Sequence, residues 1–124
     1  MINEIAAGQV WTYKCRTGEE ESRVTVFKVD SVSESSIVHI RIDGLKLINK
    51  DTGEIAGEQI AHLPVDLKSF KESIVELESL VATSVTEGYW IWKKEFDAGN
   101  AGVWALQISE VINIIEDSLS ENSD

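Results

Sequence analysis

Alternation of apolar and polar residues in the first half of the chain is the feature that most limits its fold. Side chains two residues apart share one face of a β-strand, so this alternation predicts strands with one buried face. The segment 9–15 places Trp11, Tyr13 and Cys15 on one such face. Further strands are expected over 23–29, 37–42, 45–48 and 59–63.

Turn-forming residues separate the expected strands. Asp30–Ser36 is polar and predicts a loop, while Asp43-Gly44 is a dipeptide typical of a tight hairpin turn. Asp51–Gly53 predicts a further turn, and we expect the strand over 59–63 to end at Pro64.

The period of the apolar residues changes at Asp66. From there one apolar stripe at helical spacing contains Leu67, Phe70, Ile74, Leu77 and Val81. Asp66 is a good N-cap residue, so we predict an amphipathic helix that begins after it.

The segment 84–106 allows two interpretations. Ser84 and Glu87 have the spacing of a capping box, which would begin a helix running to about Ala98. The aromatic run 89–92 instead favours a strand, and turn residues over 97–102 separate it from a second apolar run. We predict a β-hairpin here, with the helix as the alternative.

A last helix is expected after Ser109, its cap residue. The apolar residues that share its face are Val111, Ile112, Ile115 and Leu119. Residues 120–124 are polar, and we expect them to fray. Sequential strands with two helices predict one α+β domain over residues 1–124, an antiparallel sheet with about two helices packed on one face.

Acidic residues outnumber basic ones by 22 to 11, which gives a formal net charge of -11. Residues 1–62 hold ten acidic and seven basic side chains, and residues 63–124 hold twelve and four. The negative charge is therefore concentrated in the C-terminal half. Such a surface repels nucleic acid and anionic membranes and attracts basic proteins, so we expect a basic protein partner and no nucleic-acid or membrane binding.

Catalytic patterns are lacking. His39 and His62 are the only histidines, and Cys15 shares a strand face with Trp11 and Tyr13, as a packed thiol does. The sequence contains no phosphate loop, metal-ligand spacing or nucleophile elbow. We therefore predict no enzyme, no cofactor and no metal. The alternative is an enzyme or small-ligand binder with a pocket near His39 or His62.

Seven residues are predicted to bind the partner, because they combine exposed charge with one aromatic anchor. They are Glu19, Glu20, Glu21, Glu72, Glu76, Trp90 and Asp97. The first three follow Gly18 in a charged turn, and Glu72 and Glu76 are expected one turn apart on the helix after Asp66.

The first eight residues lack a basic region and a long apolar run, so we expect no signal peptide. No stretch approaches the roughly 20 apolar residues of a membrane span. With a single cysteine, which cannot form an internal disulfide, the sequence predicts a soluble, cytoplasmic protein.

Five segments of the chain stand out: GQVWTYKCRTGEEESRVTVFKV from Gly8, IVHIRIDGLK from Ile37, AHLPV from Ala61, SFKESIVEL from Ser69 and EGYWIWKKEFDAGNAGVW from Glu87. Together they resemble a family of small, uncharacterised bacterial proteins. The resemblance covers most of the chain and includes the order of its elements. It implies no activity, cofactor or catalytic residue.

In character the chain is also similar to the immunity proteins that neutralise bacterial toxins, which are small, acidic and cytoplasmic. Such toxins include basic nucleases, whose phosphate-binding surface an acidic protein could cover. We therefore expect an immunity-type inhibitor of a basic toxin domain. A DNA mimic is a third possibility, but Lys68, Lys71, Lys93 and Lys94 interrupt the rows of acids that it would require.

Overall fold

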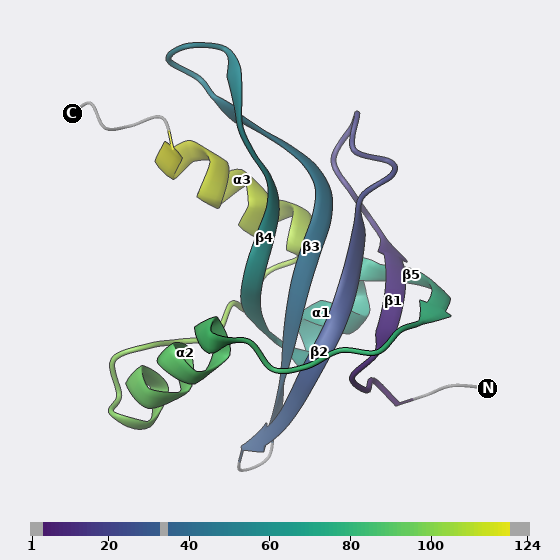
Figure 1. Cartoon of the computed structure of the whole chain (residues 1–124), viewed down its shortest axis with the longest axis vertical. Helices are drawn as coiled ribbons and strands as arrows, with labels where there is room; N and C mark the ends of the chain where they lie inside the picture. The colour runs from purple at the N-terminus through teal and green to yellow at the C-terminus, as the bar shows by residue number, and fades with distance from the viewer. Residues whose placement is uncertain (1–3, 33–34, 120–124) are drawn as a thin grey trace.

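The computed structural model describes residues 4–32 and 35–119. Within them the chain forms an α+β domain, as predicted, with one five-stranded antiparallel sheet in the order β4-β3-β2-β1-β5 and three helices (Figure 1). The strands are β1 (Gln9–Tyr13), β2 (Arg23–Val32), β3 (Ser35–Asn49), β4 (Glu54–Asp66) and β5 (Ile74–Leu80). The helices are α1 (Leu67–Ser73), α2 (Glu87–Asp97) and α3 (Ile108–Leu119).

The two faces of the sheet are covered differently. Helices α1 and α3 pack on one face and touch each other, which confirms the expected helix pair (Figure 1). The core lies between them and the sheet and includes Val26, Ile40, Phe70 and Ile112. On the other face, the chain after β5 crosses in front of β2 and β3 and leads into α2, which contacts β4 (Figure 1).

The helix predicted after Asp66 is much shorter than expected. The Asp66 side chain caps it as predicted, accepting a hydrogen bond from the Ser69 N–H at 2.7 Å, but α1 ends at Ser73. Residues 74–80 instead pair with β1, where Leu77 faces Trp11 and Ile74 faces Tyr13. Strand β5 thus advances by three residues where β1 advances by two, which is a β-bulge. The bulge explains why Ile74 and Leu77 are spaced as they would be in a helix although they lie in a strand.

The hairpin predicted over 84–106 is wrong, and the alternative helix is confirmed as α2. Its aromatic side chains Tyr89, Trp92 and Phe96 are spaced to share one helical face, and Tyr89 is fully buried. Packing of this face on the sheet outweighs the strand preference of aromatic residues. The helix begins after Thr86, so Ser84 is not its cap.

Two expected strand ends also differ. Asp43-Gly44 does not form a turn, because β3 continues through it to Asn49, whereas the turn at Asp51–Gly53 is confirmed. Strand β4 continues through Pro64 to Asp66. It lies at the edge of the sheet, where a residue without an N–H is tolerated.

The last helix begins at Ile108, one residue before the predicted cap Ser109. The Ile108 N–H donates to the Oγ of Ser73 at 3.0 Å, which links α3 to the end of α1. Val111 and Ile112 are buried as expected, while Leu119 is exposed. The expected fraying of residues 120–124 falls outside the described residues. Of the polar loop predicted over 30–36, residues 30–32 and 35–36 belong to strands.

Candidate functional site

An open, acidic hollow of about 950 Å³ lies between the loop 18–21 and the neighbouring parts of β3 and β4. Its charged lining residues are Glu19, Glu20, Glu21, Asp43, Glu58 and Lys46. Five carboxylates against one ammonium give this concave surface a strongly negative potential. The sequence prediction found the three glutamates of the loop but missed Asp43 and Glu58, which reach the hollow only through the pairing of β3 with β4.

Glu19 does not present its carboxylate to a partner, contrary to the expectation. Its side chain is 2% exposed and receives two hydrogen bonds from the Arg16 guanidinium, at 2.7 and 2.8 Å. Burial raises the pKa of Glu19, but these bonds and one from the Lys46 N–H outweigh it and keep the pKa below its usual value. Arg16 also pairs with Glu116 of α3 at 2.9 Å. Glu19 therefore belongs to a network of ion pairs beneath the hollow.

The remaining carboxylates of the hollow are at its surface. Glu20 and Glu21 are exposed, and an Oε of Glu20 accepts the Gly18 N–H at 3.0 Å. Hydrogen bonding to the Gly18 N–H lowers the pKa of Glu20, which keeps it charged. Glu58 is exposed on β4, and Asp43 pairs with Arg41 at 3.0 Å. Glu20, Glu21 and Glu58 thus offer charge to an incoming cation.

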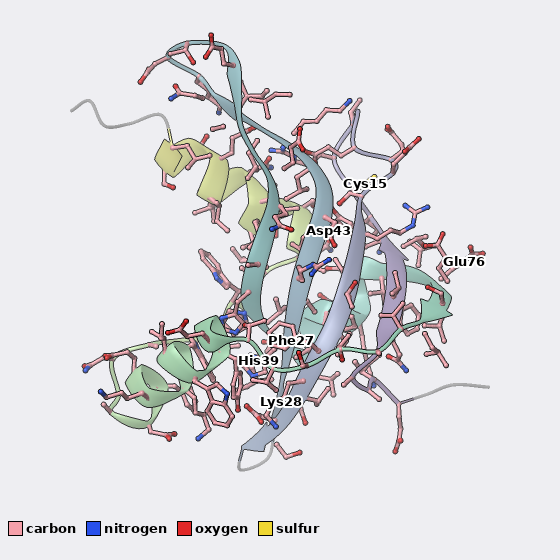
Figure 2. The ribbon with its side chains drawn as sticks, viewed as in Figure 1. Cys15, Phe27, Lys28, His39, Asp43 and Glu76 are labelled. Atoms are coloured by element: carbon pink, nitrogen blue, oxygen red, sulfur yellow. The ribbon has the colours of Figure 1, made fainter. Side chains whose placement is uncertain are left out.

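The other predicted partner-binding residues lie elsewhere. Glu72 is on α1, with its carboxylate 3.8 Å from Lys68, and Glu76 is on β5, so the two are not one turn apart on a helix. Figure 2 shows Glu76 at the outer edge of the sheet, away from Asp43. Trp90 and Asp97 are on α2, where Trp90 is 58% exposed and Asp97 pairs with Lys93. The structure therefore does not bring the seven residues together.

A second polar cluster, which the sequence analysis did not anticipate, forms where α2 meets the sheet. We call Asp30, His39 and His62, with Tyr89 above them, the histidine cluster. Figure 2 shows His39, Phe27 and Lys28 on the sheet beside α2. His39 is completely buried and His62 is half-buried.

Two β-bulges assemble this cluster. The first bulge lies in β2, which advances by two residues from Val26 to Lys28 while its partner β3 advances by only one. Lys28 and Asp30 therefore lie on the same face of the sheet as His39. The second bulge lies in β4, on the other side of β3. Strand β4 advances by three residues from Ile60 to Leu63 while β3 advances by two, which places His62 on the face that carries His39. Bulges re-aim side chains in this way, and an unbroken alternation would have placed Asp30 on the core face.

Hydrogen bonds connect the cluster in a chain that runs from His62 as donor, through His39, to Asp30 as the final acceptor. The carboxylate of Asp30 can only accept, so the His39 Nε2–H donates to its Oδ2 at 3.0 Å. In neutral His39 this leaves Nδ1 as an acceptor, and it receives the Nε2–H of His62 at 3.0 Å. The Tyr89 hydroxyl also donates to Asp30 Oδ2, at 2.8 Å.

Burial sets the protonation of the cluster. Desolvation lowers the pKa of His39 to about 4, even though Asp30 opposes the shift, and burial also lowers the pKa of His62. Burial raises the pKa of Asp30, but hydrogen bonds from Tyr89 and Lys28 outweigh it and keep the pKa below its usual value. At neutral pH the cluster therefore holds an ionised Asp30 and two neutral imidazoles.

The histidine cluster borders two smaller hollows of about 470 and 250 Å³. Phe27 lines the first of these, and Asp30 and Trp92 line the second, but neither histidine lines the acidic hollow or either of the two smaller ones. Among the described residues, no group of three His, Cys, Asp or Glu side chains is placed to hold a metal ion.

Comparison with protein-family models, with curated proteins and with solved structures finds no match to this chain. The resemblance to small bacterial proteins stays a prediction. None of the helices in the described part of the chain has the length and apolarity needed to cross a membrane.

Proposed function

We propose that this chain is an acidic protein-binding module, of the immunity type, that covers and neutralises a basic toxin domain. The observation that carries the proposal is the acidic hollow, which gathers exposed Glu20, Glu21 and Glu58 around a concave surface. Its size and openness suit lysine and arginine side chains of a protein surface. The formal net charge of -11 extends this attraction beyond the hollow.

The ion pairs beneath the hollow support a binding role. Arg16, Glu19 and Glu116 fix the loop 18–21 to β3 and α3 before any partner arrives. A rigid surface loses little conformational entropy on binding, which improves affinity for a given contact area. The surface glutamates therefore sit on a preorganised support.

The alternative, an enzyme or small-ligand site near His39 or His62, gains support from the hydrogen-bonded chain to Asp30. Against it, His39 is completely buried, and neither histidine lines any of the three hollows. A general base has to come within hydrogen-bond reach of its substrate. We therefore retain the binding role as the proposal.

Charge reversal tests the hollow. The double variant E20K/E21K should associate with the partner at least about tenfold more slowly than the wild type, with a weaker salt dependence. The partner is first identified by copurification from native cells and mass spectrometry, and the rates are then measured by surface plasmon resonance at several salt concentrations. Inhibition of the partner's activity, titrated in parallel, tests neutralisation.

The matched control is E72K/E76K, which makes the same change in net charge outside the hollow. We expect it to slow association by only about twofold, because the long-range field is reduced equally but local contacts are kept. Equal slowing by both pairs would remove the hollow from the proposal. An acidic partner, or one that retains its activity when saturated, would contradict the proposed function itself.

Replacing Trp90 tests separately whether this residue is the aromatic anchor of the interface. If its exposed ring on α2 fills a pocket of the partner, W90A should speed dissociation by about 30-fold, or about 2 kcal/mol, with little change in association. The same kinetic measurement reports both rates. Unchanged dissociation would confine the interface to the hollow.

A further inference from the structure

Helix α2 is held on the sheet mainly through the histidine cluster. Tyr89 is 1% exposed, and its ring meets His39 edge-on at a centroid distance of 4.8 Å. Trp92 meets the same imidazole edge-on at 4.8 Å and His62 at 6.0 Å. The remaining face of α2 is open to solvent, with Trp90 58% and Ile91 60% exposed.

The charged and titratable groups that face the two histidines come from strand β2 and helix α2. Strand β2 supplies Lys28 and Asp30, whose Nζ and Oδ1 atoms lie 3.2 Å apart. Helix α2 supplies Tyr89, whose ring centroid lies 5.6 Å from the Lys28 Nζ above it. Lys93 and Asp97 of α2 line the hollow beside Asp30 and pair with each other. The surroundings thus hold one negative charge, that of Asp30, and one positive charge, that of Lys28, next to the imidazoles, and the two are paired with each other.

The hydrogen-bonded chain can accept one proton but not two. A proton added to the free Nδ1 of His62 leaves both existing hydrogen bonds intact. A second proton, on His39 Nδ1, places N–H groups on both of the nitrogens that face each other at 3.0 Å. The bond is then lost, and two like charges lie 5.2 Å apart between ring centroids.

We propose that the histidine cluster is a proton-operated latch, which holds α2 on the sheet at neutral pH and releases it on acidification while α1 and α3 stay in place. Release exposes the imidazoles to water because Tyr89 and Trp92 cover them. Helices α1 and α3 pack on the opposite face of the sheet, against a hydrophobic core that does not include Asp30 or the two histidines.

The direction of the pH effect follows from the burial of His39. In the latched form its pKa is about 4, whereas a solvated imidazole has a pKa of about 6.5. The released form therefore binds protons more readily, and lowering the pH between these two values shifts the equilibrium toward release. Desolvation is the largest cause of the lowered pKa, so it outweighs the attraction between protonated His39 and Asp30.

Hydrogen exchange of the full-length protein tests the latch. Protection of the α2 amides, corrected for the intrinsic pH dependence of exchange, should fall at least about tenfold between roughly pH 7 and pH 4.5. Protection of α3, read from the same samples by mass spectrometry, should stay constant. Loss of protection in both helices, or in neither, would overturn the proposal.

The double variant H39Q/H62Q keeps amide donors for the hydrogen bonds and removes both titrating groups. Its α2 should show no pH-dependent loss of protection, and an undiminished loss would show that the cluster is not the switch. Should this variant fail to fold, Y89F serves instead. It keeps the ring but loses the bond to Asp30, so α2 should be released at a higher pH than in the wild type, and an unchanged midpoint would count against the latch.

Discussion

Replacing Arg16 with methionine is expected to lower the free energy of unfolding by about 3–5 kcal/mol, the usual cost of removing one partner from a buried ion pair. The guanidinium bonds Glu19 and Glu116, whose side chains are only 2% and 11% exposed. Both carboxylates also accept backbone N–H groups, from Lys46 and Ile48. Without Arg16, two negative charges would lie close together in a poorly hydrated place.

The matched control is R23M. Arg23 pairs with Glu78 at 2.8 Å, but both side chains are about a third or more exposed, so the loss should stay below about 1 kcal/mol. Urea unfolding of the wild type and the two variants gives the comparison. The triple variant R16M/E19Q/E116Q should recover part of the loss, because it removes the unpaired charges while keeping acceptors for the two N–H groups. Equal, small effects of R16M and R23M would contradict a structural role for the buried network.

The class of the fold could be predicted from the sequence because alternation and turn residues are local signals. Trp11 and Tyr13 share a buried face, and Asp66 caps a helix, as expected. The predicted boundaries of helices and strands were wrong where pairing with a strand distant in the sequence decided them. The spacing of Ile74 and Leu77 fits both a helix and a bulged strand, and only the presence of β1 as a neighbour selects the strand.

The candidate sites were less predictable than the fold. Exposed Glu20 and Glu21 could be expected from a charged turn, but the sequence contains no signal that Glu19, between them and Arg16, is buried. The histidine cluster depends on two bulges: the one in β2 changes the face of Asp30 relative to an ideal strand, and the one in β4 changes the face of His62. Bulges leave little trace in one sequence, so the pairing of both histidines with Asp30 became visible only in three dimensions.

A second large effect is expected at Gly44, in the bulged part of β3 that lines the hollow. Its φ is 77°, in the left-handed region that favours glycine, and a Cβ there would lie 2.9 Å from Ser22 Cα and 3.2 Å from the Glu21 carbonyl oxygen. The left-handed conformation costs alanine about 1–2 kcal/mol. Overpacking against backbone adds about 1–3 kcal/mol, so G44A should lose about 3 kcal/mol.

Ser22 has little freedom to move away from an added methyl group. Its buried hydroxyl donates to the Asp43 carbonyl oxygen at 2.6 Å and lies 2.7 Å from the hydroxyl of Tyr13. Burial raises the pKa of Tyr13 to about 12, so this hydroxyl stays protonated and able to donate. A shift of Ser22 would therefore strain two buried hydrogen bonds.

Gly53 provides the matched control for G44A. Its φ of 78° is nearly the same, but no atom lies within 4 Å of the position of a Cβ. G53A should therefore show only the conformational cost, about 1–2 kcal/mol, and the difference between the two variants measures the close approach at Ser22. Urea unfolding of both variants makes the comparison. If they lost equal stability, the loop 18–21 could yield at Ser22, and the hollow would not be the rigid support that the proposed binding role requires.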